Sequence, residues 1–341
     1  MSIIKPDDWH VHLRDHDKLK STVPATAHHF ARALIMPNLQ PALTSVEAIN
    51  KYHRRIIQAI PEKNTFTPYM TLYLNESIEP AVFDAISKTS HIIGAKLYPA
   101  GATTNSDAGA QSIKRLYPLF EAMQSNQLVL QIHGEVTFGD IFEREARFIK
   151  DELQALIKNF PKLRVVLEHI STKAAVDFIT AAPEQVAATI TPHHLLYNRN
   201  HLLAGGIKPH YYCLPILKHR DDQLAIQQAA VSGNPKFFLG TDSAPHTQLQ
   251  KESACGCAGI FSAPYALPIY AQVFDTLNKL ERLEAFASQF GADFYELARN
   301  QSHIELIKKP SVIPKHYPYN ADYVIPIAAG ETLQWSIHAN P

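Results

Sequence analysis

The stretch "DDWHVHLRD", which begins at residue 7, places His10 and His12 on either side of Val11. In a β-strand the side chains alternate between two faces, so both imidazoles would point the same way and Val11 the other. Two imidazoles on one face can share a metal ion. They can equally be two polar residues at the end of a strand, so the rest of the sequence has to decide.

Other ionisable side chains stand at or near the ends of apolar runs. Lys96 lies in "HIIGAKLY", His133 ends "LVLQIH", His169 ends "LRVVLEH" and Asp242 ends "KFFLGTD". One histidine at such a place is more often structural, but burying this whole set without partners would cost several kcal/mol for each group. Histidine nitrogens and a carboxylate are suitable ligands for zinc or a similar divalent metal.

Lys96 does not fit a metal site in its ordinary form, because an ammonium repels a cation. It is either an exposed lysine or a chemically altered one. Its neighbours in "GAKLYPAG" are small or apolar, and a bare charge is unfavourable there. Carboxylation by CO2 would convert the amine into a carbamate anion that could bridge two metals.

Eight short apolar runs alternate with segments of helical spacing. The runs predict strands at 7–12, 32–37, 66–74, 91–98, 128–133, 163–169, 186–192 and 236–242. Helical spacing occurs at 46–60, 110–126, 142–160, 172–182 and 221–232. Apolar strands that alternate with amphipathic helices indicate parallel strands covered by helices. Eight units favour an α/β fold of the (β/α)8 TIM-barrel type, whose active site lies at the C-terminal ends of the strands.

A doubly wound open sheet is the alternative fold. A Rossmann-type version of it would need a glycine fingerprint after the first strand, and "HLRDHDKLK" contains none. Residues 268–300 are expected to form one or two helices. The Pro-rich tail beyond them contains the extended pieces "ADYVIP" and "TLQWSI". This appendage is too small for a second core, so we expect a single domain over residues 1–341.

The composition narrows the classes of function. The chain has 341 residues, of which 46% are hydrophobic and 19% charged, and this is typical of a globular protein. Lys+Arg and Asp+Glu are both 32, which argues against nucleic acid as a partner. No apolar stretch approaches the roughly 18 residues of a membrane span. The N-terminus lacks a signal-peptide pattern, so we expect a cytoplasmic protein with no membrane partner.

Three cysteines, Cys213, Cys255 and Cys257, are an odd number in a long chain, which argues against a disulfide framework. Cys255-Gly-Cys257 lacks the second pair that a structural zinc site needs. We therefore expect free thiols in a loop. His193, in "TPHHL", is interpreted as structural.

The strand-end residues resemble those of the amidohydrolase superfamily, which holds a binuclear metal centre on such a set. The closer resemblance is to the dihydroorotase family, in its short, barrel-only bacterial type, and it covers nearly the whole chain. His-x-His alone is a weak signal, but an ordered set of motifs is specific. The set is "DDWHVHLRD", "MPNLQP", "GAKLYPAGATTNS", "LEHIST", "YCLPILK" and "GTDSAPH" followed by "KESACGCAGIFSAP".

The resemblance implies a role for each matching residue. One metal would be held by His10, His12, Lys96 and Asp242, and the other by Lys96, His133 and His169. The implied substrate-binding positions are His12, Arg14, Asn38, Thr103, Thr104, His133, Leu214, His246 and Ala258. Among these, Arg14, Asn38 and His246 would meet a substrate carboxylate, because an arginine fork pairs well with carboxylate oxygens. The loop "GATTNSDAG", with Thr103 and Thr104, would close over the substrate.

The implied activity is the reversible cyclisation of N-carbamoyl-L-aspartate to L-dihydroorotate, a step of pyrimidine synthesis. The implied cofactors are two divalent ions, with zinc favoured and cobalt or manganese also compatible, and a carbamate on Lys96. A hydroxide that bridges the metals would attack the ring carbonyl, and Asp242 would act as general base and then as general acid. A homodimer is the family expectation.

Two other functions remain to be weighed. A hydantoinase or allantoinase would share these ligands, but such chains usually carry a β-sandwich built partly from residues before the first barrel strand. Only nine residues precede His10 here. A non-catalytic barrel that binds a partner would be expected to have gaps in the ligand set, and this set has none.

Overall fold

The computed structural model describes residues 1–338. Eight parallel strands form one sheet, and each strand pairs with the next along the chain from β2 to β9. Each predicted strand range contains one of them. The strands are β2 (Asp7–Val11), β3 (Arg32–Ile35), β4 (Thr67–Leu74), β5 (Ile92–Leu97), β6 (Val129–Ile132), β7 (Arg164–Leu167), β8 (Val186–Ile190) and β9 (Phe237–Leu239).

Backbone hydrogen bonds between the first strand and the segment after the last one close this sheet. The amide of Asp242 donates to the carbonyl of His10 at 2.8 Å, and the amide of His12 donates to the carbonyl of Ser243 at 3.0 Å. Val11 and Ser243 form a parallel bridge at the same place. The predicted (β/α)8 TIM barrel is therefore confirmed, and the doubly wound alternative is wrong.

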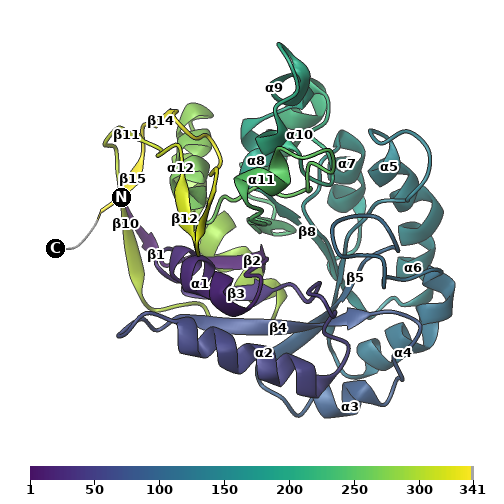
Figure 1. The fold of residues 1–341 in the computed structure, drawn as a ribbon. Coiled ribbons are helices and arrows are strands. Elements are labelled where there is room, and N and C mark those ends of the chain that lie inside the picture. Colours follow the sequence, from purple (N-terminus) through teal and green to yellow (C-terminus); the bar gives the residue numbers. More distant parts are fainter. Residues whose placement is uncertain (339–341) are drawn as a thin grey trace.

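Helices surround the barrel (Figure 1). The predicted helical ranges contain α2, α4, α5 with α6, and α7, and α10 begins one residue before its predicted range. A π-helical turn at Ile149–Leu153 joins α5 to α6. The helices are α1 (Leu19–Ala27), α2 (Val46–Ala59), α3 (Val82–Ile86), α4 (Tyr117–Ser125), α5 (Arg144–Phe148), α6 (Gln154–Asn159), α7 (Lys173–Ala181), α8 (Pro192–Leu196), α9 (Arg199–Leu203), α10 (Arg220–Ala230), α11 (Gln248–Lys251), α12 (Ala266–Thr276) and α13 (Phe290–Phe294).

Helix α2 shows how the sequence sets a covering helix. The side chain of Ser45 accepts a hydrogen bond from the amide of Ala48 and so caps the first turn. Ile49, Tyr52 and Ile56 recur on one face and are fully buried against the barrel. The helix thereby covers the outside of the strands and leaves the inside free for polar groups.

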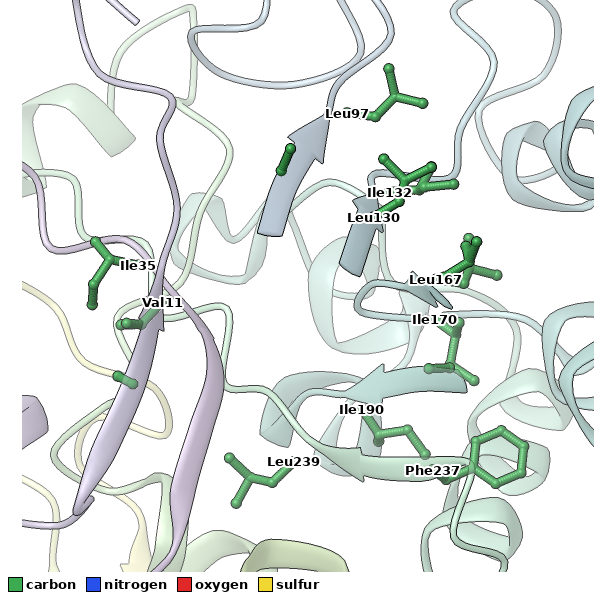
Figure 2. Packing of buried hydrophobic residues seen from close by; sticks show 14 of the residues in the cluster. Val11, Ile35, Leu97, Leu130, Ile132, Leu167, Ile170, Ile190, Phe237 and Leu239 are labelled. Atoms are coloured by element: carbon green, nitrogen blue, oxygen red, sulfur yellow. The ribbon is translucent and has the colours of Figure 1, made fainter. Parts of the chain in front are cut away.

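Alternation along the strands sorts side chains between that outer layer and the barrel interior. On β6, Leu130 and Ile132 belong to the apolar layer between strands and helices, as do Leu97 on β5 and Leu167 on β7 (Figure 2). Gln131 takes the opposite face and donates to the hydroxyl of Tyr295 inside the barrel at 3.1 Å. By the same alternation, the residues that follow these strands reach the interior at its C-terminal end.

The N-terminal end of the barrel is closed by packing and by ion pairing. The rings of Trp9 and Tyr295 stack with their centroids 4.4 Å apart. Arg32, at the start of β3, donates from Nε to Asp7 Oδ1 at 2.8 Å, and Asn300 donates to the same oxygen at 2.7 Å. This end therefore forms a packed base.

The tail forms small antiparallel sheets beside the barrel (Figure 1). β1 (Ser2–Ile4) pairs with β10 (His303–Ile307), and β10 pairs with β15 (Ser336–Ile337). β11 (Ser311–Val312) pairs with β14 (Thr332–Leu333), and β12 (Tyr317–Tyr319) pairs with β13 (Asp322–Val324). The two extended pieces predicted in the tail contain β13, β14 and β15. The pairing of the N-terminal strand β1 with β10 of the tail was not predicted.

The expected single domain over 1–341 also includes residues 339–341, which lie outside the described residues. Among the described helices, none has the length and apolar character needed to cross a membrane.

Candidate metal centre and substrate pocket

A pocket at the C-terminal ends of the barrel strands brings together most of the predicted site residues. Lys96 and His246 are the two that do not line it, and Tyr98, Ala244 and Gly259 line it without having been predicted. The predicted residues that line the pocket are His10, His12, Arg14, Asn38, Thr103, Thr104, His133, His169, Leu214, Asp242 and Ala258.

Three donor atoms converge at the point where the barrel closes. Nε2 of His10 and Nε2 of His12 lie 3.3 Å apart, and they are 3.4 Å and 3.0 Å from Oδ1 of Asp242. A tetrahedral zinc ion with ligands at about 2.0–2.1 Å separates its donor atoms by about 3.4 Å. These spacings therefore fit the ligand edges of one metal ion.

His133 and His169 lie beside this group. Donor atoms of His10, His169 and Asp242 all fall within 4.8 Å of one another, and the rings of His133 and His169 are 4.8 Å apart. Within residues 1–338, the buried Nδ1 of His169 has no hydrogen-bond partner. A buried nitrogen without a partner is costly unless a ligand uses it, so this position also fits a metal.

Lys96 is fully buried, and its Nζ has no hydrogen-bond partner in the described part of the chain. Burial lowers the pKa of Lys96 to about 8, against the opposing effect of the Glu168 and Asp242 carboxylates. A neutral amine is thus accessible near neutral pH, and a neutral amine is the form that reacts with CO2. The environment fits the carbamate interpretation and rules out the exposed-lysine alternative.

Two buried glutamates orient the histidines from behind. Oε2 of Glu168 lies 2.8 Å from Nδ1 of His10 and accepts from the hydroxyl of Thr189 at 2.6 Å. Oε2 of Glu135 lies 2.9 Å from Nε2 of His133. Metal-binding histidines commonly pair their second nitrogen with a carboxylate in this way. Neither glutamate was predicted, although each stands within two residues of a predicted histidine.

Asp242 is held in its charged form. Burial by itself would raise the pKa of this carboxyl, but the charge of His10 and the hydrogen bond from His12 outweigh it and keep the pKa well below its usual range. The backbone is also constrained, because φ is 44° at Asp242 and 43° at His169. Left-handed φ values at residues other than glycine cluster at functional sites.

Arg14 stands beside the predicted ligands with no acidic partner. Its Nε donates to the carbonyl of Pro245 at 3.0 Å, and its Nη2 lies 3.0 Å from Nε2 of His246. No carboxylate among the described residues forms a salt bridge with it. His246 therefore lies behind Arg14, and its Nε2 is also 3.1 Å from the carbonyl of Ala258. Direct contact between His246 and a substrate stays a prediction.

The loop that carries Thr103 and Thr104 lies closed over the pocket. Nδ2 of Asn38 donates to the carbonyl of Thr104 at 3.1 Å, and the Thr104 hydroxyl donates to the carbonyl of Ala258 at 3.2 Å. The cavity beneath measures about 20 Å³, which is room for about one water molecule. A ring-shaped substrate therefore fits only if the residues that line the pocket move apart.

A second group of donor atoms lies nearby but does not form a metal site. His193, His194 and Cys213 bring donor atoms within 4.8 Å of one another. However, Nε2 of His194 lies 3.1 Å from the carbonyl of Pro215, and its Nδ1 lies 2.8 Å from the hydroxyl of Thr191. A carbonyl only accepts, so Nε2 carries the proton and Nδ1 is already used as an acceptor. His194 has no free lone pair.

His193 and the three cysteines have no role in the proposed site. His193 is fully buried, and its structural interpretation stays a prediction. Cys213, Cys255 and Cys257 are all free thiols, as predicted.

Comparisons with known proteins agree with this geometry. Residues 3–326 match the model of the amidohydrolase family. A dihydroorotase from Coxiella burnetii is 54% identical over 342 residues, covering 100% of this chain and 98% of the relative. A dihydroorotase from Nitrosococcus oceani is 55% identical over 339 residues, covering 99% of this chain and 98% of the relative.

Solved structures give the same result. Dihydroorotase from Campylobacter jejuni superposes with a TM-score of 0.92 at 36% identity, covering 99% of this chain and 97% of that one. Dihydroorotase from Saccharomyces cerevisiae in complex with 5-fluoroorotic acid superposes with a TM-score of 0.90 at 35% identity, covering 100% of this chain and 99% of that one. L-Hydantoinase from Arthrobacter aurescens superposes with a TM-score of 0.79 at 16% identity, covering 99% of this chain and 83% of that one. At this identity the likeness shows the fold alone. The ligand set, the barrel and these matches together establish that the chain belongs to the amidohydrolase family.

Proposed function

We propose that this protein is a dihydroorotase, which interconverts N-carbamoyl-L-aspartate and L-dihydroorotate. The observation that carries the proposal is Arg14, a guanidinium that lines a pocket of metal-ligand side chains and has no acidic partner in the described chain. A guanidinium fork is suited to a carboxylate, and both of these compounds carry one beside the reacting amide. The names of the full-length relatives support the same activity.

The pocket is proposed to bind two divalent metal ions, and zinc suits its histidine and carboxylate donors. His10, His12 and Asp242 would hold one, His133 and His169 the other, and a carbamate on Lys96 would bridge them. The carbamate forms when the neutral Lys96 amine adds to CO2 and releases one proton. Support comes from the donor spacings of 3.0–3.4 Å and from the buried Nζ of Lys96, which has no hydrogen-bond partner among residues 1–338.

Several side chains would bind and orient the substrate. Arg14, Asn38 and His246 would meet the carboxylate, and His246 would also hold the guanidinium of Arg14 in place. The backbone at Leu214 and Ala258 would contact the ring. Thr103 and Thr104 would close over it and exclude water from the reacting carbonyl.

The metal pair, when bound, supplies Lewis acidity that polarises the amide carbonyl and lowers the pKa of water. Asp242 would move the proton. Its low pKa keeps it ionised, so its carboxylate can take a proton from the attacking water and give it to the ring nitrogen as the C–N bond breaks. The reverse sequence closes the ring.

The nearest alternative function is that of a hydantoinase. Structures named hydantoinase share the fold at 13–16% identity, and a likeness at that level does not decide the substrate. Hydantoin carries no carboxylate, so a hydantoinase would leave the guanidinium of Arg14 without an anion. The unpaired arginine therefore favours dihydroorotate.

We also propose that the protein works as a homodimer in the cytoplasm. A reducing compartment suits its three free thiols. Size-exclusion chromatography with light scattering measures the assembly directly, and a monomeric mass would contradict the dimer.

The activity is tested by supplying the purified protein with L-dihydroorotate, hydantoin and allantoin in parallel, with its metal content measured in the same preparation. We expect L-dihydroorotate to be hydrolysed far faster than the other two. We also expect N-carbamoyl-L-aspartate to be cyclised by the same preparation. A preference for hydantoin or allantoin would overturn the proposal.

A further inference from the structure

Lys251, the last residue of α11, is a buried lysine outside the pocket lining. It is only 3% exposed, and its Nζ donates to the carbonyls of Tyr212 at 2.7 Å, Cys257 at 2.9 Å and Gly259 at 2.9 Å. An ammonium has three N–H donors, and all three are used. Burial lowers the pKa of Lys251 to about 8. Burying an ammonium group costs free energy, so a lysine that is buried with three carbonyl contacts is expected to have a role in the structure or the function.

The three carbonyls belong to the two backbone segments that form one wall of the pocket. Cys257 and Gly259 stand on either side of Ala258, whose own carbonyl accepts from Thr104. Tyr212 precedes Leu214 by two residues, and its carbonyl also accepts from the amide of Gly259 at 3.0 Å. The ammonium thus joins residues 212–214, the Leu214 segment, to residues 257–259, the Ala258 segment. Leu214 and Ala258 both line the pocket.

Cys257, next to Ala258, has a backbone conformation that needs such support. Its φ is 30°, in the left-handed region that only glycine adopts freely, and it stands between Gly256 with φ 68° and Gly259 with φ 150° in the chain around Ala258. A Cβ atom at Gly259 would lie 2.5 Å from the carbonyl oxygen of Ala244, so the chain passes very close to its neighbour there. A left-handed φ at a residue other than glycine persists only where the surroundings impose it, and the Lys251 ammonium holds the carbonyl of Cys257 itself.

We propose that Lys251 is a positioning residue for the reaction: it fixes the backbone at Leu214 and Ala258 in the arrangement that meets the substrate ring. The inference rests on the proposed dihydroorotase function. Lys251 touches neither substrate nor metal ligands in this scheme. Its removal should therefore weaken substrate binding far more than it slows the chemical step.

The test compares Lys251→Met with Lys251→Arg and Lys251→Gln. We expect KM for L-dihydroorotate to rise at least tenfold in K251M, while kcat changes less than threefold and metal content stays at the wild-type level. K251R keeps the charge and several donors, so it should recover part of the loss. K251Q keeps a donor without the charge and provides a second removal variant if K251M folds poorly.

Lys236 provides a matched control, because its Nζ also donates to three carbonyls, those of Ile179, Thr180 and Ala182. It precedes β9, at the opposite end of that strand from Asp242. Lys236→Met should lower Tm without changing KM. A KM within twofold of wild type in K251M, or an equal rise of KM in K236M, would overturn the proposal.

The two proposals fail in different ways. If the wild type hydrolyses hydantoin and not L-dihydroorotate, the function is wrong, and the same KM comparison on hydantoin still decides the role of Lys251. Amide hydrogen exchange of residues 256–259 gives a readout without any substrate. Exchange there should become faster in K251M and not in K236M, and unchanged exchange would contradict the positioning role.

Discussion

Buried polar groups have hydrogen-bond partners at the N-terminal end of the barrel, whereas several at the C-terminal end have none among the described residues. At the N-terminal base, Asp7 accepts from both Arg32 and Asn300, and Arg32 also donates to the carbonyl of Ala298 at 2.8 Å. At the C-terminal rim, Nζ of Lys96 and Oε1 of Glu168 are buried with no partner inside the described chain.

The difference separates stability from function. A buried polar atom without a partner costs about 1–3 kcal/mol, so the rim loses stability that the base retains. The loss is tolerated where a ligand or metal later uses those atoms. Substitutions at the base should therefore change the free energy of unfolding, and substitutions at the rim should change metal binding and catalysis.

The largest effect is expected for Lys96→Ala. Removing the proposed bridge should abolish most metal binding and lower kcat/KM at least about a thousandfold, or about 4 kcal/mol. The barrel should stay folded, because Lys96 makes no hydrogen bond within the described residues. Metal analysis, steady-state kinetics and Tm measure the three effects. Near-full activity with both metals retained would reject the carbamate.

At the N-terminal base, Arg32→Met is expected to lower stability and to leave catalysis unchanged. Leaving Asp7 buried without its cation should cost about 3–5 kcal/mol of unfolding free energy, with kcat and KM unchanged below the melting transition. Urea denaturation gives the stability. The control is the double variant with Asp7→Asn, which removes the stranded charge and should recover part of the loss. A single-variant cost below about 1 kcal/mol would contradict the contrast between the two ends.

Arg14→Met should weaken substrate binding and leave both metals in place. Losing the charged partner of a carboxylate typically costs about 2–5 kcal/mol. The expected fall in kcat/KM for L-dihydroorotate is therefore at least about thirtyfold. Should kcat/KM fall less than about threefold, Arg14 does not hold the carboxylate.

The smallest effect is expected for the double variant Thr103→Ala, Thr104→Val in the closing loop. Two lost hydroxyl contacts at about 0.5–1.5 kcal/mol each predict a fall in kcat/KM of about fivefold to about 150-fold. Tm and metal content should barely change. Amide exchange of residues 101–109, with and without a substrate analogue, tests loop closure independently. Protection that does not change on binding would mean that the loop is only a connection between β5 and α4.

The strands and the histidines of the proposed metal site could be predicted from sequence for one physical reason. Strands of a closed parallel barrel are covered on both faces, so they appear as short apolar runs, and a polar residue at the end of a run stands out. Val11 packs in the outer layer while His10 and His12 converge inside, as alternation predicts. Helix α1 lacked such a signal, because Pro24 interrupts its pattern.

The supporting residues could not be predicted because their roles depend on distant parts of the chain. Glu168 is recognised only by its contact with His10, which lies on another strand. Lys251 resembles any surface lysine in the sequence, and its burial depends on the segments at Tyr212 and at residues 257–259. The position of His246 behind Arg14 is likewise set by three-dimensional packing.

The barrel is closed by the same residues that supply the proposed metal ligands. The amide of Asp242 bonds to the carbonyl of His10, so the first and last barrel strands must meet before the three donors can converge. During synthesis, the N-terminal histidines leave the ribosome long before β9 does. A nascent chain therefore cannot bring these three donors together until β9 and Asp242 have emerged, which is after about two thirds of the sequence has been translated.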